Sequence, residues 1–226
     1  MKANCSVITA LLLLTLALGF AAVAAATDES AEAKPHPALL DPSLATETAP
    51  DIYRVKMETT AGDFVIEVHR EWAPIGADRF YNLVTIGYFN NVAFFRVLAG
   101  FMAQAGFHGD PAVSRAWLNS RIKADPVLKS NYPGTVTFAM GGHPDTRSAQ
   151  FFINYGDNSY LDESGFAPFG KVIEGMESVD ALYSGYGEGQ PRGKGPNQGK
   201  LYAGGNAYLE AEFPKLDYIK KASIIE

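Results

Sequence analysis

Short segments in which apolar and polar residues alternate recur along most of this chain, and they restrict its fold more than any other feature. A period of two is typical of β-strands, whose successive side chains point to opposite faces. Two such segments, 53–59 and 64–69, flank the turn sequence Ala61-Gly62-Asp63 and predict a β-hairpin. Further strands are predicted at 94–98, 101–105, 134–140, 150–154, 169–173 and 218–225.

Only two stretches have a clear helical period. The first opens at Pro74 and stops at Gly87, and the second follows Ile173. Their apolar stripes consist of Ala77, Phe80, Leu83 and Val84, and of Met176, Val179, Leu182 and Tyr183. Because strands and helices do not alternate as in βαβ units, the chain is expected to be mainly β, a closed antiparallel barrel capped by two α-helices.

The N-terminal part has the composition of a targeting segment followed by a linker. Residues 1–26 combine one early cation, Lys2, with a long apolar block and a small-residue cleavage site, which predicts a signal peptide. The alternative is an uncleaved anchor, because residues 7–26 are about long enough to span a bilayer. Residues 27–50, rich in proline and alanine, are predicted to be a flexible tether, and residues 51–226 form the domain.

Two regions of the domain are predicted to be irregular. Residues 107–133 read as a polar insert that Trp117 and Ile122 pin to the surface. Residues 185–205 read as a glycine-rich loop, with a short helix predicted at 208–213.

Charge and motifs exclude several functional classes. The formal net charge of −6 and the absence of a basic patch argue against nucleic acid or an anionic membrane surface as partner. Cleavage of the leader would remove Cys5, the only cysteine, and the four histidines lack ligand spacing, so no metal site is predicted. The segment 165–171 is not a phosphate loop, because Val172 replaces the hydroxyl residue that binds magnesium. No cofactor is expected.

The candidate for chemistry is the stretch 94–106, which is apolar except for Arg96 and Gln104. A strict alternation puts Phe94, Arg96 and Leu98 on one face of a strand and Phe95, Val97 and Ala99 on the other. Gly100 breaks the run, and a second strand follows. An arginine in such a run either lies at a strand end with its head in water or is paired.

Three blocks in this chain resemble the cyclophilin-type peptidyl-prolyl isomerases. The family signature Phe-His-Arg-x-x-x-Gly-Phe-Met-x-Gln-x-Gly appears as Phe94-Phe95-Arg96-Val97-Leu98-Ala99-Gly100-Phe101-Met102-Ala103-Gln104-Ala105-Gly106. The second block appears as Phe138-Ala139 through Ala149-Gln150-Phe151-Phe152-Ile153. The third appears as Tyr160-Leu161-Asp162 and Pro168-Phe169-Gly170-Lys171-Val172. The resemblance runs from about residue 52 to residue 183.

The resemblance implies an eight-stranded antiparallel barrel with two capping helices that catalyses cis–trans isomerisation of X–Pro bonds without a metal or cofactor. It implies that Arg96 and Gln104 are catalytic. The substrate-binding residues that it implies are Phe101, Met102, Ala139, Met140, Gln150, Phe152, Tyr160, Leu161 and Phe166.

The chain departs from the family pattern at several positions, among them Phe95 in place of histidine and Ala99 in place of proline. From residue 185 onward it carries an elaboration outside the family core. The expected function is therefore a folding-assisting isomerase that acts on proline-containing, exported or lumenal polypeptides, as a monomer not inserted in a membrane after cleavage of the leader. The alternative is a non-catalytic barrel that binds proline segments or acts as a chaperone.

Overall fold

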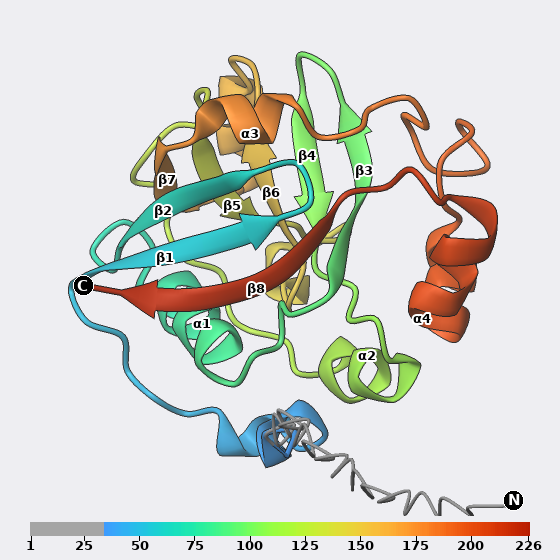
Figure 1. The fold of residues 1–226 in the computed structure, drawn as a ribbon. Coiled ribbons are helices and arrows are strands. Elements are labelled where there is room, and N and C mark those ends of the chain that lie inside the picture. The colour runs from blue at the N-terminus through green and yellow to red at the C-terminus, as the bar shows by residue number, and fades with distance from the viewer. Residues whose placement is uncertain (1–33) are drawn as a thin grey trace, which may run out of the picture. The chain divides into compact units, whose positions relative to one another are not determined.

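The structure, a computed structural model, describes residues 34–226, so the predicted signal peptide lies outside the described residues. The strands are β1 Ile52–Thr59, β2 Asp63–His69, β3 Val92–Leu98, β4 Met102–Ala105, β5 Thr135–Phe138, β6 Phe151–Asn154, β7 Pro168–Glu174 and β8 Tyr218–Ile225. They pair antiparallel in the order β1-β2-β7-β5-β6-β4-β3-β8 and close into a barrel through β8 and β1 (Figure 1). The predicted eight-stranded antiparallel barrel is confirmed.

The barrel is filled by apolar side chains, many of them aromatic. Helix α1, Pro74–Thr85, places Phe80 among the rings of Phe89, Phe151 and Phe169, at centroid distances of 4.8–5.5 Å. These contacts are edge-on or tilted, which suits the quadrupoles of the rings. The period-two strands thus supply a dense interior, and α1 closes one end of it.

The helical content exceeds the prediction. Helix α3, Met176–Asp180, lies at the opposite end of the barrel from α1 (Figure 1). Two further helices, α2 Pro111–Leu118 and α4 Gln198–Glu212, lie next to each other beside the barrel. Short 3₁₀ turns are η1 Pro37–Leu39, η2 Pro42–Leu44, η3 Pro144–Thr146 and η4 Ser159–Ser164. None of the helices described between residues 34 and 226 is long and apolar enough to cross a membrane.

The two predictions of irregular structure are therefore partly wrong. Within 107–133, Asp110 caps α2 through its side chain and Pro111 takes the first helical position, a start signal that is present in the sequence. Within 185–205, α4 begins at Gln198, where Asn197 accepts a hydrogen bond from the Lys200 amide. The predicted short helix at 208–213 is the second half of α4.

The prediction of a flexible tether is also wrong for residues 35–50. This segment belongs to the same compact unit as the barrel. Asn82 of α1 exchanges two hydrogen bonds with the backbone of Glu47, at 2.9 and 2.7 Å, and Trp117 donates from Nε1 to the Leu39 carbonyl at 3.1 Å. Composition did not reveal this order, because the partners of the segment's backbone are side chains far along the chain.

Strand β3 does not alternate as predicted. Phe94 and Val97 both belong to the main core, whereas Phe95 belongs to a second apolar cluster that includes residues of α4. The pairing with β4 shifts register between Phe94 and Arg96. One extra residue at this β-bulge reverses the alternation, so that Phe94 and Val97 face the same side. The bulge directs Arg96 away from the core.

Candidate functional site

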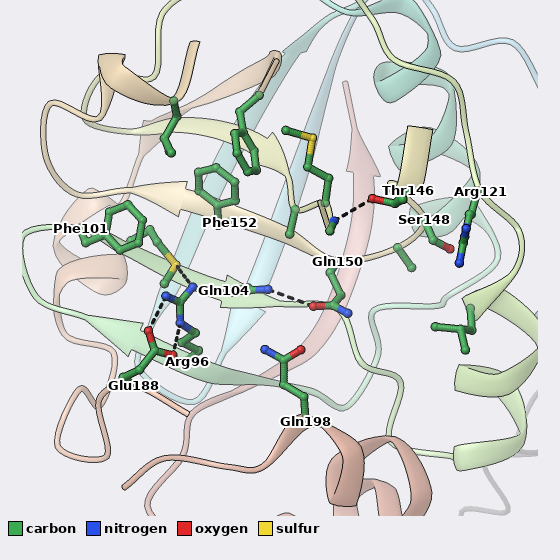
Figure 2. Close-up of a pocket in the computed structure, with 18 of the residues that line it drawn as sticks. Arg96, Phe101, Gln104, Arg121, Thr146, Ser148, Gln150, Phe152, Glu188 and Gln198 are labelled. Carbon is green, nitrogen blue, oxygen red and sulfur yellow. Dashed lines mark hydrogen bonds and ion pairs between the residues drawn. The ribbon is translucent and has the colours of Figure 1, made fainter. Parts of the chain in front are cut away.

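The register of three neighbouring strands assembles the centre of the site. Arg96 of β3 lies opposite Gln104 of β4, and Gln104 lies opposite Phe152 of β6. Residues directly opposite in a sheet share one face. The flanking residues Ala103 and Ile153 belong to the main core. The arginine, the amide and the aromatic ring therefore form a row on the outer face of the barrel (Figure 2).

A cavity of about 500 Å³ lies over this row. Ten of the eleven predicted site residues line it, namely Arg96, Phe101, Met102, Gln104, Ala139, Met140, Gln150, Phe152, Leu161 and Phe166. The structure does not bring Tyr160 into it: Tyr160 is 61% exposed and is not among the lining residues. Both Tyr160 and Leu161 lie in η4, where neighbouring side chains diverge by about a third of a turn, so only one of the two faces the cavity.

Arg96 is held by a chain of polar contacts. Its Nη1 donates to Oε1 of Gln104 at 3.0 Å, and Nε2 of Gln104 donates to Oε1 of Gln150 at 2.9 Å. The guanidinium carbon lies 5.7 Å from the centroid of the Phe101 ring, within cation–π range. The linked amides of Gln104 and Gln150 thus hold Arg96 from one side, and the Phe101 ring holds it from another.

The apolar wall of the cavity is built from β4, β6 and η4. Met102 and Phe152 are buried, and the Phe152 and Phe166 rings meet edge-on with centroids 5.8 Å apart. Asp162 anchors η4, because its carboxylate accepts from the Asn131 amide at 3.0 Å and from Asn131 Nδ2 at 2.7 Å. This anchor sits next to Leu161 and holds the wall in place.

Several lining residues were not predicted. They are Leu118, Arg121, Gly141, Thr146, Ser148, Ala149, Glu188, Arg192 and Gln198. Glu188 contacts Arg96 directly, with Nε to Oε1 at 2.8 Å and Nη2 to Oε2 at 2.7 Å (Figure 2). The hydrogen bonds from Arg96 lower the pKa of Glu188 despite its partial burial. The glycine-rich context of Glu188 carried no signal for such a role.

The site is equipped to bind an apolar ring beside a cationic donor. Within the part of the chain that the structure describes, no group of three or more His, Cys, Asp or Glu side chains could hold a metal ion. The cavity has an apolar wall, three guanidinium groups, of which Arg96 belongs to the central row, and several amides. Together, the closed antiparallel barrel and the cavity on its outer face define the class of protein to which this chain belongs.

Comparison with known proteins identifies the family. The family model for cyclophilin type peptidyl-prolyl cis-trans isomerases matches residues 54–198. Peptidyl-prolyl cis-trans isomerase A of Dickeya dadantii is 36% identical over 134 residues, which cover 57% of this chain and 70% of that protein. Peptidyl-prolyl cis-trans isomerase B of Escherichia coli is 35% identical over 137 residues, covering 57% and 82%.

Solved structures agree on the fold. A Cryptosporidium parvum cyclophilin type isomerase, solved in the presence of the dipeptide Ala-Pro, aligns with a TM-score of 0.57 and 22% identity over 76% of this chain and 99% of that one. The chain belongs to the cyclophilin-type peptidyl-prolyl cis–trans isomerase family. The predictions of fold, family and enzyme class are confirmed.

Proposed function

We propose that the cavity binds the proline of a polypeptide and that Arg96 accelerates rotation about the preceding peptide bond. Rotation about an amide must cross about 18–20 kcal/mol, and at X–Pro bonds it takes tens to hundreds of seconds unaided. No covalent bond forms or breaks. A hydrogen bond donated to the imide nitrogen favours its pyramidal form and weakens the resonance that keeps the bond planar.

The observation that carries this proposal is the number of donors that Arg96 keeps free. A guanidinium has five N–H donors. Glu188 takes one from Nε and one from Nη2, and Gln104 takes one from Nη1. Two donors remain, one on each terminal nitrogen, and the remaining Nη1 group has only the weak acceptor Sδ of Met102, at 4.0 Å. These two are available to a substrate in the cavity.

The rest of the cavity supplies orientation and a low dielectric. Phe101, Met102, Phe152, Leu161 and Phe166 surround the space for the proline ring and keep water away from the arginine, which strengthens its hydrogen bonds.

The polar part of the cavity wall faces the substrate backbone. The Ala139 amide already donates to the Gln150 carbonyl at 2.9 Å, so the Ala139 carbonyl is the group left for a substrate amide. Gln104 and Gln150 line the cavity beside it, and Met140 extends the same wall. These residues hold one side of the peptide while the other side turns.

A protease-coupled assay on a proline peptide tests this function. The wild-type protein is expected to accelerate the slow cis-to-trans phase in proportion to enzyme concentration. Binding of the peptide without acceleration would instead support the non-catalytic alternative. Titration of the same peptide by fluorescence or calorimetry measures that binding separately.

We further propose that the substrates are exported or lumenal polypeptides and that the enzyme acts as a monomer that is not inserted in a membrane after loss of its leader. The apolar block and the Ala24-Ala25-Ala26 site in the sequence support export and cleavage of the leader. N-terminal sequencing of the protein purified from its native cell tests it, with Thr27 expected as the first residue. A full-length chain found in the membrane fraction would overturn it.

A further inference from the structure

A carboxylate from the C-terminal elaboration binds the catalytic arginine. Glu188 forms a two-point ion pair with Arg96, and the two side chains are only 20% and 27% exposed for Arg96 and Glu188 respectively. The Glu188 carboxylate binds the edge of the guanidinium that Nε and Nη2 form. Gln104 approaches Nη1. Glu188 and Gln104 thus hold the arginine from two directions. The two N–H groups that are available to substrate have no oxygen acceptor among the described residues.

We propose that Glu188 is a positioning residue for the isomerase reaction: it locks the guanidinium of Arg96 in the orientation that presents its free donors to the proline. The proposal rests on the function assigned above to Arg96. It also gives the elaboration from residue 185 a place in the site, as the segment that delivers this carboxylate.

Hydrogen bonds from the surrounding backbone restrain Glu188. The Gly195 amide donates to the Glu188 carbonyl at 2.8 Å, and the Gly189 amide donates to Oε1 at 2.8 Å. A Cβ atom on Gly193 would lie 2.2 Å from the Glu188 carbonyl oxygen, so the loop folds too tightly at that point for any larger residue. Glycine at position 193 allows close packing against the backbone of Glu188, and the loop is held by its own hydrogen bonds.

The loop is fastened to the barrel through one of the departures from the family signature. Phe95 stands in the signature next to Arg96, and its ring meets that of Phe107 with centroids 5.1 Å apart. Both belong to the second apolar cluster, together with Leu201 and Leu209 of α4. At the other end of the loop, the Tyr186 ring packs against Phe213, 5.1 Å between centroids. A histidine in place of Phe95 would bring a polar ring into this apolar contact.

This arrangement decides between two effects that a carboxylate could have on Arg96. A counterion that occupied the donors needed by substrate would inhibit. Here the carboxylate takes a different edge, so its main effect is to remove the rotamer freedom of a long side chain, which reaches about 2 kcal/mol in a free arginine. Loss of the pair is therefore expected to lower kcat/KM by about 5- to 30-fold.

The experiment combines kinetics with a direct view of the arginine. We expect kcat/KM to fall in the order wild type, Glu188→Gln, Glu188→Ala, because the amide can still accept one hydrogen bond. Glu210→Gln is the matched control: Glu210 lies exposed on α4, outside the cavity lining, and the wild-type rate is expected. Circular dichroism and melting temperature verify that each variant is folded.

The second readout is the Nε–H resonance of Arg96 in ¹⁵N-correlated NMR, assigned by its loss in Arg96→Lys. We expect it to be sharp and slow to exchange with water in the wild type and in Glu210→Gln, and to shift and exchange faster in both Glu188 variants. Folded Glu188→Ala with wild-type or higher kcat/KM, or an unchanged Nε–H signal, would overturn the proposal. If the wild type itself fails to accelerate isomerisation, the function fails, while the NMR signal still reports on the pairing.

Discussion

Replacing Arg96 with alanine tests whether Arg96 is the hydrogen-bond donor that accelerates isomerisation. The variant loses the two free N–H donors and keeps the apolar wall, because Met102 and Phe152 belong to other strands. We expect the variant still to bind proline segments but to accelerate rotation about the X–Pro bond less than the wild type does. The change removes a donor that acts mainly when the imide nitrogen becomes pyramidal.

The magnitude follows from the environment of the donor. A hydrogen bond from a charged group contributes about 1.5–3 kcal/mol, and one preorganised donor in a water-poor site about 2.7–4 kcal/mol to the transition state. Arg96 is partly buried among apolar side chains, so we expect a loss of about 2–4 kcal/mol. This corresponds to about 30- to 1,000-fold in kcat/KM.

The assay is the protease-coupled cleavage of a proline peptide, followed at several enzyme concentrations. The single variant leaves the Glu188 carboxylate without its partner in the cavity, which could repel a substrate carbonyl. The double variant Arg96→Ala with Glu188→Gln removes that charge and is expected to remain as slow as the single variant. Wild-type kcat/KM in both variants would refute the assignment of Arg96 as the donor.

Three predictions concern stability. Asp125→Ala is expected to cost about 3–5 kcal/mol of unfolding free energy in denaturant titrations, because this buried carboxylate pairs with a guanidinium and caps two amides at the start of α1. Gly106→Ala is expected to lower the melting temperature by several degrees, since its φ is +117° and an added Cβ would lie 2.5 Å from the Ala149 carbonyl oxygen. The hydrogen bond from Arg96 lowers the pKa of Glu188, so the pair stabilises the fold above the usual glutamate range and loses that contribution as the pH falls through the lowered pKa. The melting-temperature difference between wild type and Glu188→Gln is therefore expected at pH 7 and should shrink as the pH falls below the usual glutamate range; a difference that grows as the pH falls would contradict the reasoning.

Local sequence patterns predicted most of the fold. The hairpin of β1 and β2 followed from alternation around a glycine turn, and α1 followed from its proline start and glycine stop. The residues of the site centre were named through the resemblance to the family signature, whereas their place in one row depends on the register of β3, β4 and β6. Where one extra residue enters, as at Phe95, the alternation reverses, and no local signal in the stretch marked that bulge.

The sequence by itself determined the barrel and the family, and it named ten of the residues that line the cavity, since these depend on the short-range periods of strands and on a spaced signature. Only the tertiary structure decided the order of residues 35–50, the exposure of Tyr160 and the contact of Glu188 with Arg96. These depend on contacts between distant segments: Arg96 and Glu188 are 92 positions apart. Such a contact leaves no periodic trace in the chain, because it is set by how the loop and α4 pack on the closed barrel.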